Sequence, residues 1–134
     1  MDLLIGHWIL QKSENLQEFL KALGVGIVLR NIAPKVNGDL TIEKVGEGQF
    51  RIQNTNGFKK SDRIIEIGVE FKGDELNGSA MLGKWEVEED GKMCGQFKGK
   101  TEDIFTITRE VTGDVLVQTM EFKGCVAKRI YNRK

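Results

Sequence analysis

From Leu40 onward, apolar and polar residues alternate along the chain in short segments separated by mostly glycine-containing turns. Alternation with a period of two is typical of strands that bury one face. The segments with this pattern are Leu40–Lys44, Gln49–Asn54, Asp62–Phe71, Ala80–Glu88, Lys92–Phe97, Ile104–Val111, Val115–Phe122 and Cys125–Asn132. With a further apolar segment at Leu4–Gln11, and because some segments are long enough to split, the pattern predicts nine or ten strands.

The pattern changes after the first predicted strand, where apolar residues recur every three or four positions. The residues that share this helical face are Leu16, Phe19, Leu20 and Leu23. They predict a short helix that begins near Ser13 or Asn15 and ends at Gly24. A second helix is predicted over Gly26–Lys35, with Pro34 near its end.

Short strands at regular spacing, joined by tight turns, predict an antiparallel β-barrel or sandwich. A barrel of nearly ten strands is wide enough to leave an interior cavity. The two helices, inserted between the first and second strands, would close one mouth of it. No linker interrupts the chain, so we expect one domain over residues 1–134.

The last three predicted strands are joined by turns at Gly113-Asp114 and Lys123-Gly124. If both turns are two-residue loops, Arg109, Gln118 and Arg129 form one row across the three strands. Tyr131, two residues beyond Arg129, lies on the same face. The other residues of that face are Phe105, Ile107, Leu116, Met120, Phe122 and Ala127.

Two arginines on an otherwise apolar face need an anion or a paired acid, because burying an unpaired charge costs several kcal/mol. The pattern therefore indicates a pocket for an acid group attached to an apolar body. The alternative is that Arg109 or Arg129 points to solvent, since a slip of one residue in either turn would reverse its face.

Composition narrows the function classes. The chain has 20 basic and 20 acidic residues, so its net charge is zero and gives no sign of nucleic-acid binding. A DNA-binding helix-turn-helix protein is therefore disfavoured. Cys94 and Cys125 form no CxxC pair, and with His7 as the only histidine a zinc site lacks ligands. No nucleophile–base arrangement is evident, so we expect neither an enzyme nor a cofactor or metal.

The opening residues, Met1-Asp2, lead into a short apolar segment without a basic region or a run of signal-peptide length. No stretch approaches the roughly 18 apolar residues of a membrane span. The expectation is a cytoplasmic protein, which we expect to be a monomer.

Several motifs resemble those of the intracellular lipid-binding proteins, the fatty-acid- and retinoid-binding family, over essentially the whole chain. They are Ile5-Gly6-His7-Trp8, Lys21-x-Leu23-Gly24-Val25-Gly26 followed by Arg30, Phe58-Lys59, Gly68-Val69-Glu70-Phe71, Arg109-Glu110-Val111 and Arg129-x-Tyr131. The last two are similar to the family's carboxylate-binding triad.

The resemblance implies an all-β fold, a ten-stranded antiparallel up-and-down β-barrel with a two-helix cap, that binds one long-chain fatty acid. Arg129 and Tyr131 would hold the carboxylate directly, and Arg109 would act beside them. Phe58 would lie at the portal near the helices. The further cavity residues expected are Gln118, Met120 and Leu116.

Some positions depart from the family pattern and leave alternatives open. Gln118 stands where an apolar residue or a thiol is general, which makes the head end of the pocket more polar. Retinoic acid or a bile acid is therefore a second candidate ligand, and a protein-interaction adaptor on the same barrel is a third reading. Basic residues of the cap, Lys21, Arg30 and Lys35, could make transient membrane contact, although a solvated helix face is the simpler interpretation.

Overall fold

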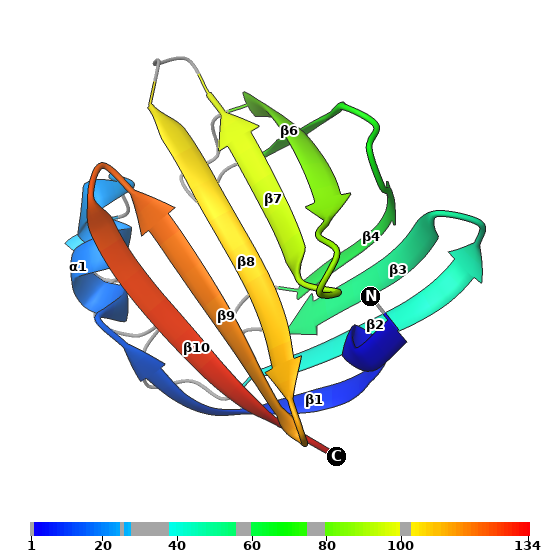
Figure 1. Cartoon of the computed structure of the whole chain (residues 1–134). Helices are drawn as coiled ribbons and strands as arrows, with labels where there is room; N and C mark the ends of the chain where they lie inside the picture. The colour runs from blue at the N-terminus through cyan, green and yellow to red at the C-terminus, as the bar shows by residue number, and fades with distance from the viewer. Residues whose placement is uncertain (1, 25, 28–37, 56–59, 75–79, 100–102) are drawn as a thin grey trace.

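The computed structural model of the protein describes residues 2–24, 26–27, 38–55, 60–74, 80–99 and 103–134. The elements are η1 (Asp2–Leu4), β1 (Gly6–Glu14), α1 (Leu16–Ala22), β2 (Asp39–Gly46), β3 (Gln49–Thr55), β4 (Lys60–Glu66), β5 (Phe71–Asp74), β6 (Ala80–Val87), β7 (Met93–Lys98), β8 (Ile104–Thr112), β9 (Val115–Phe122) and β10 (Cys125–Arg133). Figure 1 shows them curled into a barrel-like shape.

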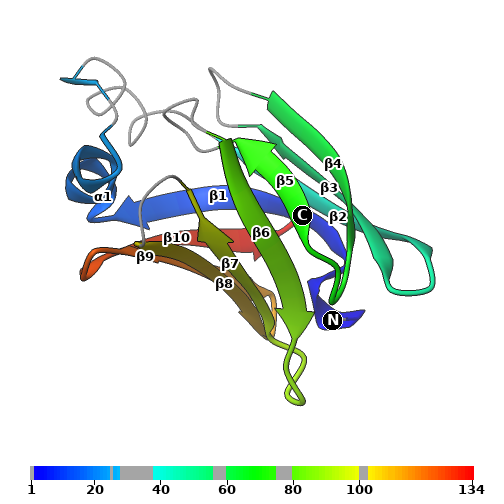
Figure 2. The ribbon, with the colours of Figure 1, turned by 90° about the horizontal axis from the view of Figure 1, so that it is seen from above.

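All ten strands belong to one sheet, in the order β4-β3-β2-β1-β10-β9-β8-β7-β6-β5. Every neighbouring pair is antiparallel. The predicted ten-stranded, up-and-down antiparallel fold is confirmed. The strands β4 and β5 end the order, so among the described residues the ring is not closed by pairing between them. Figure 2 shows these two edge strands on the same side of the molecule.

The inner face of the curled sheet carries the core, because alternate residues of each strand point inward. Buried apolar side chains come from nearly every strand and from α1. The largest fully buried ones are Trp8, Tyr131, Phe19, Leu4, Leu40, Ile42, Met93 and Leu116. The indole Nε1 of Trp8 donates a hydrogen bond of 2.9 Å to the carbonyl oxygen of Leu4, which fixes η1 against the start of β1.

The predicted first helix is confirmed as α1. Asn15 precedes it in the left-handed conformation, with φ of 56°, and its side chain donates 2.8 Å to the carbonyl oxygen of Val126 on β10. Phe19 is fully buried and its ring lies 5.6 Å from that of Phe105 on β8. The helix therefore packs against the strands that carry the arginines. The predicted second helix lies outside the described residues apart from Gly26 and Ile27.

The predicted strand segment Asp62–Phe71 is divided in the structure, as was expected of some of the long segments. Its first residues belong to β4, the chain turns at Ile67 and Gly68, where Gly68 has φ of +80°, and Phe71 begins β5. The amide nitrogen of Gly68 donates 2.7 Å to the carbonyl oxygen of Trp85 on β6. A glycine in this conformation interrupts the strand at the point where the sheet has its edges.

Among the described residues, no helix is long and apolar enough to cross a membrane.

Candidate functional site

The site is built on one row of the sheet. Arg109 of β8 pairs with Gln118 of β9, and Gln118 pairs with Arg129 of β10. Both connecting turns are two-residue loops, since Thr112 pairs with Val115 and Phe122 with Cys125. The register counted from the sequence is therefore confirmed. The row continues in both directions, to Met93 of β7 and Ser13 of β1.

The row lies on the inner face. Arg109 is 5% exposed, Gln118 4%, Arg129 6% and Tyr131 1%. The alternative orientation, with the arginines in solvent, is thereby excluded. Four polar side chains lie inside an apolar shell, which is the arrangement that the sequence predicted.

Arg109 is held by uncharged groups on three sides. Its Nε donates 2.9 Å to Oε1 of Gln118, and its Nη1 lies 3.9 Å from the Sδ of Met93. Its Cζ lies 5.1 Å from the centre of the Trp85 ring, a distance at which the ring face attracts a cation. Gln118 in turn directs its Nε2 to the Sδ of Met120, at 3.5 Å. These contacts fix the guanidinium without neutralising it.

The charge state of the site reflects burial. Burial lowers the pKa of Arg109 from its ordinary 12.5 to about 10, because the charged form loses its hydration; the nearby Tyr131 opposes this shift. Burial also raises the pKa of Tyr131, against the opposing effect of Arg129 and Arg109. At neutral pH the site thus holds a charged Arg109 beside a neutral phenol.

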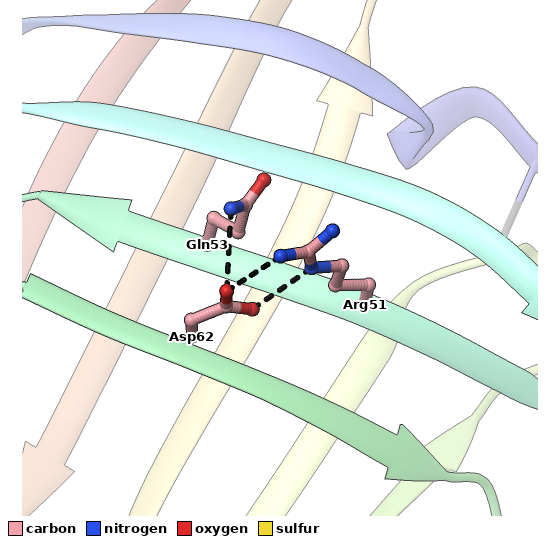
Figure 3. A network of polar contacts seen from close by, with 3 residues as sticks. All are labelled: Arg51, Gln53 and Asp62. Atoms are coloured by element: carbon pink, nitrogen blue, oxygen red, sulfur yellow. Dashed lines mark hydrogen bonds and ion pairs between the residues drawn. The ribbon is translucent and has the colours of Figure 1, made fainter.

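An arginine on the outer face of the sheet, Arg51, is paired with a carboxylate, as arginines in proteins often are. Arg51 of β3 donates to Asp62 of β4 through Nε at 3.0 Å and Nη2 at 2.7 Å, and Gln53 adds a contact of 3.4 Å (Figure 3). The pKa of Asp62 is lowered and that of Arg51 raised by this hydrogen-bonded pair. By contrast, no carboxylate of a described residue lies within ion-pair distance of Arg109.

Around the row the inner face of the sheet is aromatic and aliphatic. The ring of Phe97 lies 5.2 Å from that of Trp85 and 5.7 Å from that of Phe105. Phe105 continues to Phe19 of α1, so aromatic rings lead from the arginine row to the helix. An apolar chain attached to an acid group would find this wall on its path.

The predicted site residues divide into two groups. Arg109, Arg129, Tyr131 and Gln118 come together on the inner face, and Leu116 and Met120 are buried beside them. Phe58 lies outside the described residues. The binding roles of all of them stay predictions at this point.

The sequence did not reveal three neighbours of the row. Trp85 and Met93 contact Arg109, and Ser13 faces Arg129 with a buried Oγ that has no hydrogen-bond partner. The strand pattern placed Trp85 in the barrel wall, but not above a guanidinium. Alternation from Trp8 and Leu10 would have placed Ser13 on the outer face, because the register shift between Leu10 and Lys12 that turns it inward is not visible in the sequence.

The only histidine does not join the row. His7 lies next to Trp8 on the outer face of β1, where its Nε2 is 3.7 Å from Oδ2 of Asp39. The buried hydroxyl of Ser13 is on the inner face, so these three groups do not form a catalytic triad.

Comparison with known proteins identifies the family of the chain. Residues 5–134 match the model of the lipocalin / cytosolic fatty-acid binding protein family. The intestinal fatty acid-binding protein of Homo sapiens is 34% identical over 128 residues, which cover 94% of this chain and 95% of the relative.

Solved structures give the same result. Fatty-acid-binding protein 1 of Echinococcus granulosus superposes with a TM-score of 0.92 at 26% identity, covering 99% of this chain and 98% of that one. The Schistosoma mansoni fatty acid binding protein in complex with arachidonic acid gives 0.91 at 25% identity, covering 100% and 98%. The chain belongs to the lipocalin / cytosolic fatty-acid binding protein family.

Proposed function

We propose that the protein is a non-enzymatic carrier that binds one long-chain fatty acid inside the barrel. Its carboxylate would be held by Arg109, Arg129 and Tyr131, with Gln118 fixing the orientation of Arg109. The acyl chain would lie along the aromatic wall that leads toward α1.

The observation that carries this proposal is the environment of Arg109. Its side chain is buried, yet its contacts are an amide oxygen, a thioether and an indole ring. Burial of a charge without an opposite charge is costly, so an anion from outside the chain would relieve the cost. A carboxylate suits a guanidinium, whose planar fork donates two parallel hydrogen bonds.

The apolar wall supports the rest of the ligand. Transfer of an acyl chain from water to such a wall contributes about 0.8 kcal/mol per buried CH₂ group. Most of the affinity would therefore come from the chain, and the arginines would select ligands with an acid end. Relatives that are named fatty acid-binding proteins, one of them solved with arachidonic acid, support the same ligand class.

Retinoic acid or a bile acid remains the second candidate, because either one carries a carboxylate on an apolar body. The polar amide of Gln118 beside the arginines is the observation that favours a more polar head group. We further propose that the carrier acts in the cytoplasm as a monomer and contacts membranes transiently through its helical cap.

The proposal is tested first by native mass spectrometry of the purified protein, followed by identification of what is extracted from it. A one-to-one adduct with the mass of a fatty acid is expected. Competition of a fatty acid, retinoic acid and retinol against a fluorescent fatty-acid probe then ranks the ligand classes. An empty protein that also fails to bind the probe would overturn the proposal.

The role of the arginines is tested by Arg129→Ala. Loss of a charged hydrogen-bond donor should weaken fatty-acid binding by about tenfold or more, because such bonds contribute roughly 1.5–3 kcal/mol. Retinol, which has no charge, should be affected far less. The matched control is Arg51→Ala on the outer face, which should leave both affinities unchanged; equal fatty-acid affinity in the two variants would refute the assignment.

A further inference from the structure

A second polar cluster lies on the inner face, beside the open edge of the sheet. In β4 the inward positions are Ser61, Arg63 and Ile65, since Arg63 pairs with Ile52 and Ile65 with Phe50. Of these three only Ile65 is buried, whereas Ser61 and Arg63 are exposed. The inner face is thus open to solvent at the edge strand and carries a positive charge there.

Asn54 completes the cluster from the neighbouring strand. It pairs with Ser61, so Arg63 is its diagonal neighbour, at a spacing that a long side chain can bridge. The Oδ1 atom of Asn54 is buried and has no hydrogen-bond partner. Arg63 makes no ion pair with another described residue.

The contrast with the outer face of the same two strands is informative. There Arg51 is paired with Asp62 by two hydrogen bonds. On the inner face Arg63 has no such partner among the described residues, and a buried acceptor, Oδ1 of Asn54, lies beside it. A buried acceptor without a partner is unfavourable, so a ligand group that donates a hydrogen bond to this oxygen would be favoured.

The cluster and the arginine row lie on different parts of the sheet. Asn54, Ser61 and Arg63 belong to β3 and β4, whereas the row of Arg109, Gln118 and Arg129 belongs to β8, β9 and β10, with β2 and β1 between the two groups. The row of Arg63 reaches β1 at Gly6 and the row of Arg129 reaches it at Ser13, near the two ends of that strand. A long ligand whose acid end lies at the arginine row can place its other end at the cluster.

We propose that Asn54, Ser61 and Arg63 form a second polar subsite, which binds a hydroxyl or carboxylate group at the far end of the fatty acid. The inference rests on the proposed function and deepens it: the ligand class becomes long-chain acids that are oxygenated near the ω end. Arg63 and the Ser61 hydroxyl donate to the ligand oxygen, and a ligand hydroxyl donates to Oδ1 of Asn54. A plain methyl end satisfies none of these groups.

The test compares three acids of equal chain length by calorimetry: hexadecanoic acid, its ω-hydroxy derivative and the α,ω-dicarboxylic acid. The wild-type chain and Arg63→Leu are each titrated. We expect Arg63→Leu to weaken binding of the two oxygenated acids by about tenfold, as for loss of a charged hydrogen bond, and to leave or improve that of hexadecanoic acid. Arg51→Leu, on the outer face of β3, is the matched control.

An equal effect of Arg63→Leu on all three acids, or none on the oxygenated acids, would overturn the second subsite while leaving the carrier function in place. Binding of two oxygenated acids per chain, measured by native mass spectrometry, would also overturn it, since the second polar group would then belong to another molecule. If the wild-type chain bound no hexadecanoic acid, the proposed function would fail, and the subsite with it. Asn54→Leu gives an independent check. It should also weaken binding of the two oxygenated acids and leave or improve that of hexadecanoic acid. Thermal unfolding verifies that this variant folds.

Discussion

Arg109 shows at the scale of single residues how a charge is buried with no carboxylate of the described residues beside it. Gln118, Met93 and Trp85 each offer electron density to the guanidinium, through an amide oxygen, a sulfur and a ring face. None of them carries a charge, so the positive potential remains at the site. Arg51, by contrast, forms an ion pair with Asp62. Its positive charge is therefore balanced and would not attract the acid group of a ligand.

The first prediction concerns pH. Since burial lowers the pKa of Arg109 to about 10, the guanidinium loses its proton within an accessible range, and the carboxylate then loses its partner. Fatty-acid affinity should fall as pH rises above about 10, and a bound anion should move the midpoint upward. Titrations between about pH 8 and pH 11 with a fatty acid and with retinol separate this effect from unfolding. A parallel fall for both ligands would contradict it.

The same shift affects the stability of the empty protein. The folded state carries a charged Arg109 at a cost below about pH 10, because the unfolded chain keeps the ordinary value of 12.5. Between these two values the folded state releases the proton first, so the penalty from this group is relieved as pH rises. Its contribution to stability is unfavourable at neutral pH, which is consistent with a residue kept for binding.

The second prediction tests the amide. Gln118→Leu leaves the Nε of Arg109 without its acceptor inside the barrel, at a cost of about 1–3 kcal/mol in unfolding free energy. Denaturant unfolding of the empty protein measures it. Gln96→Leu, at an exposed position of β7, is the control and should be close to neutral. An unchanged midpoint for Gln118→Leu would mean that the amide does not support the arginine.

Contacts between strands joined by a short turn could be predicted from the sequence, whereas contacts between strands that no turn joins could not. The row of Arg109, Gln118 and Arg129 followed from two turns, because short loops fix the register of their strands. The contact of Trp85 with Arg109 could not follow in the same way. The two residues lie on β6 and β8, with β7 between them, so their approach depends on the curl of the sheet and on the small residues that let it form.

Gly95 is such a small residue and acts at the scale of elements. It lies on β7 opposite Trp85, and a Cβ at its position would be 2.6 Å from Cζ3 of Trp85 and 2.9 Å from Cε2 of Phe97. The absence of a side chain therefore gives the indole its place. Through Trp85, the backbone of β7 determines how Arg109 is covered.

The third prediction follows from this contact. Gly95→Ala should displace the Trp85 ring, lower stability by about 1–3 kcal/mol and weaken fatty-acid binding. Indole fluorescence and denaturant unfolding report the two structural effects. Gly26→Ala is the control, since a Cβ there meets nothing within 4 Å. A variant that kept wild-type fluorescence and stability would show that the wall tolerates the added group.

Element boundaries were predictable where a turn residue marked them and less so elsewhere. Gly24 and Asn15 enclosed the helix α1, and the glycine turns after β8 and β9 enclosed the last strands. The place where the segment Asp62–Phe71 divides, at Gly68, was not predictable, because a lone glycine in an apolar segment does not reveal its φ. The two strands on either side of this turn, β4 and β5, are the edge strands of the sheet.

At the scale of the whole molecule, alternation predicted nine or ten strands, and the family resemblance ten, but neither indicated which two strands would end the order of the sheet. Closing a ring requires that the first and last strands of the order meet, and no local pattern carries that information. The strands β4 and β5 end this order, and Ser61 and Arg63 are exposed on the inner face of β4. The fold thus combines a charged row on β8 to β10 with a second polar cluster at its edge.

The most direct test of the central claim is the ionisation of the bound ligand. A fatty acid with an isotope-labelled carboxyl carbon, bound to the protein, is followed by NMR as pH is lowered. If Arg109 and Arg129 hold the carboxylate, its pKa should lie well below the ordinary carboxyl value of about 4, because nearby positive charge favours the ionised form. A bound carboxyl that titrates above that value would place it in an uncharged apolar environment and contradict the account.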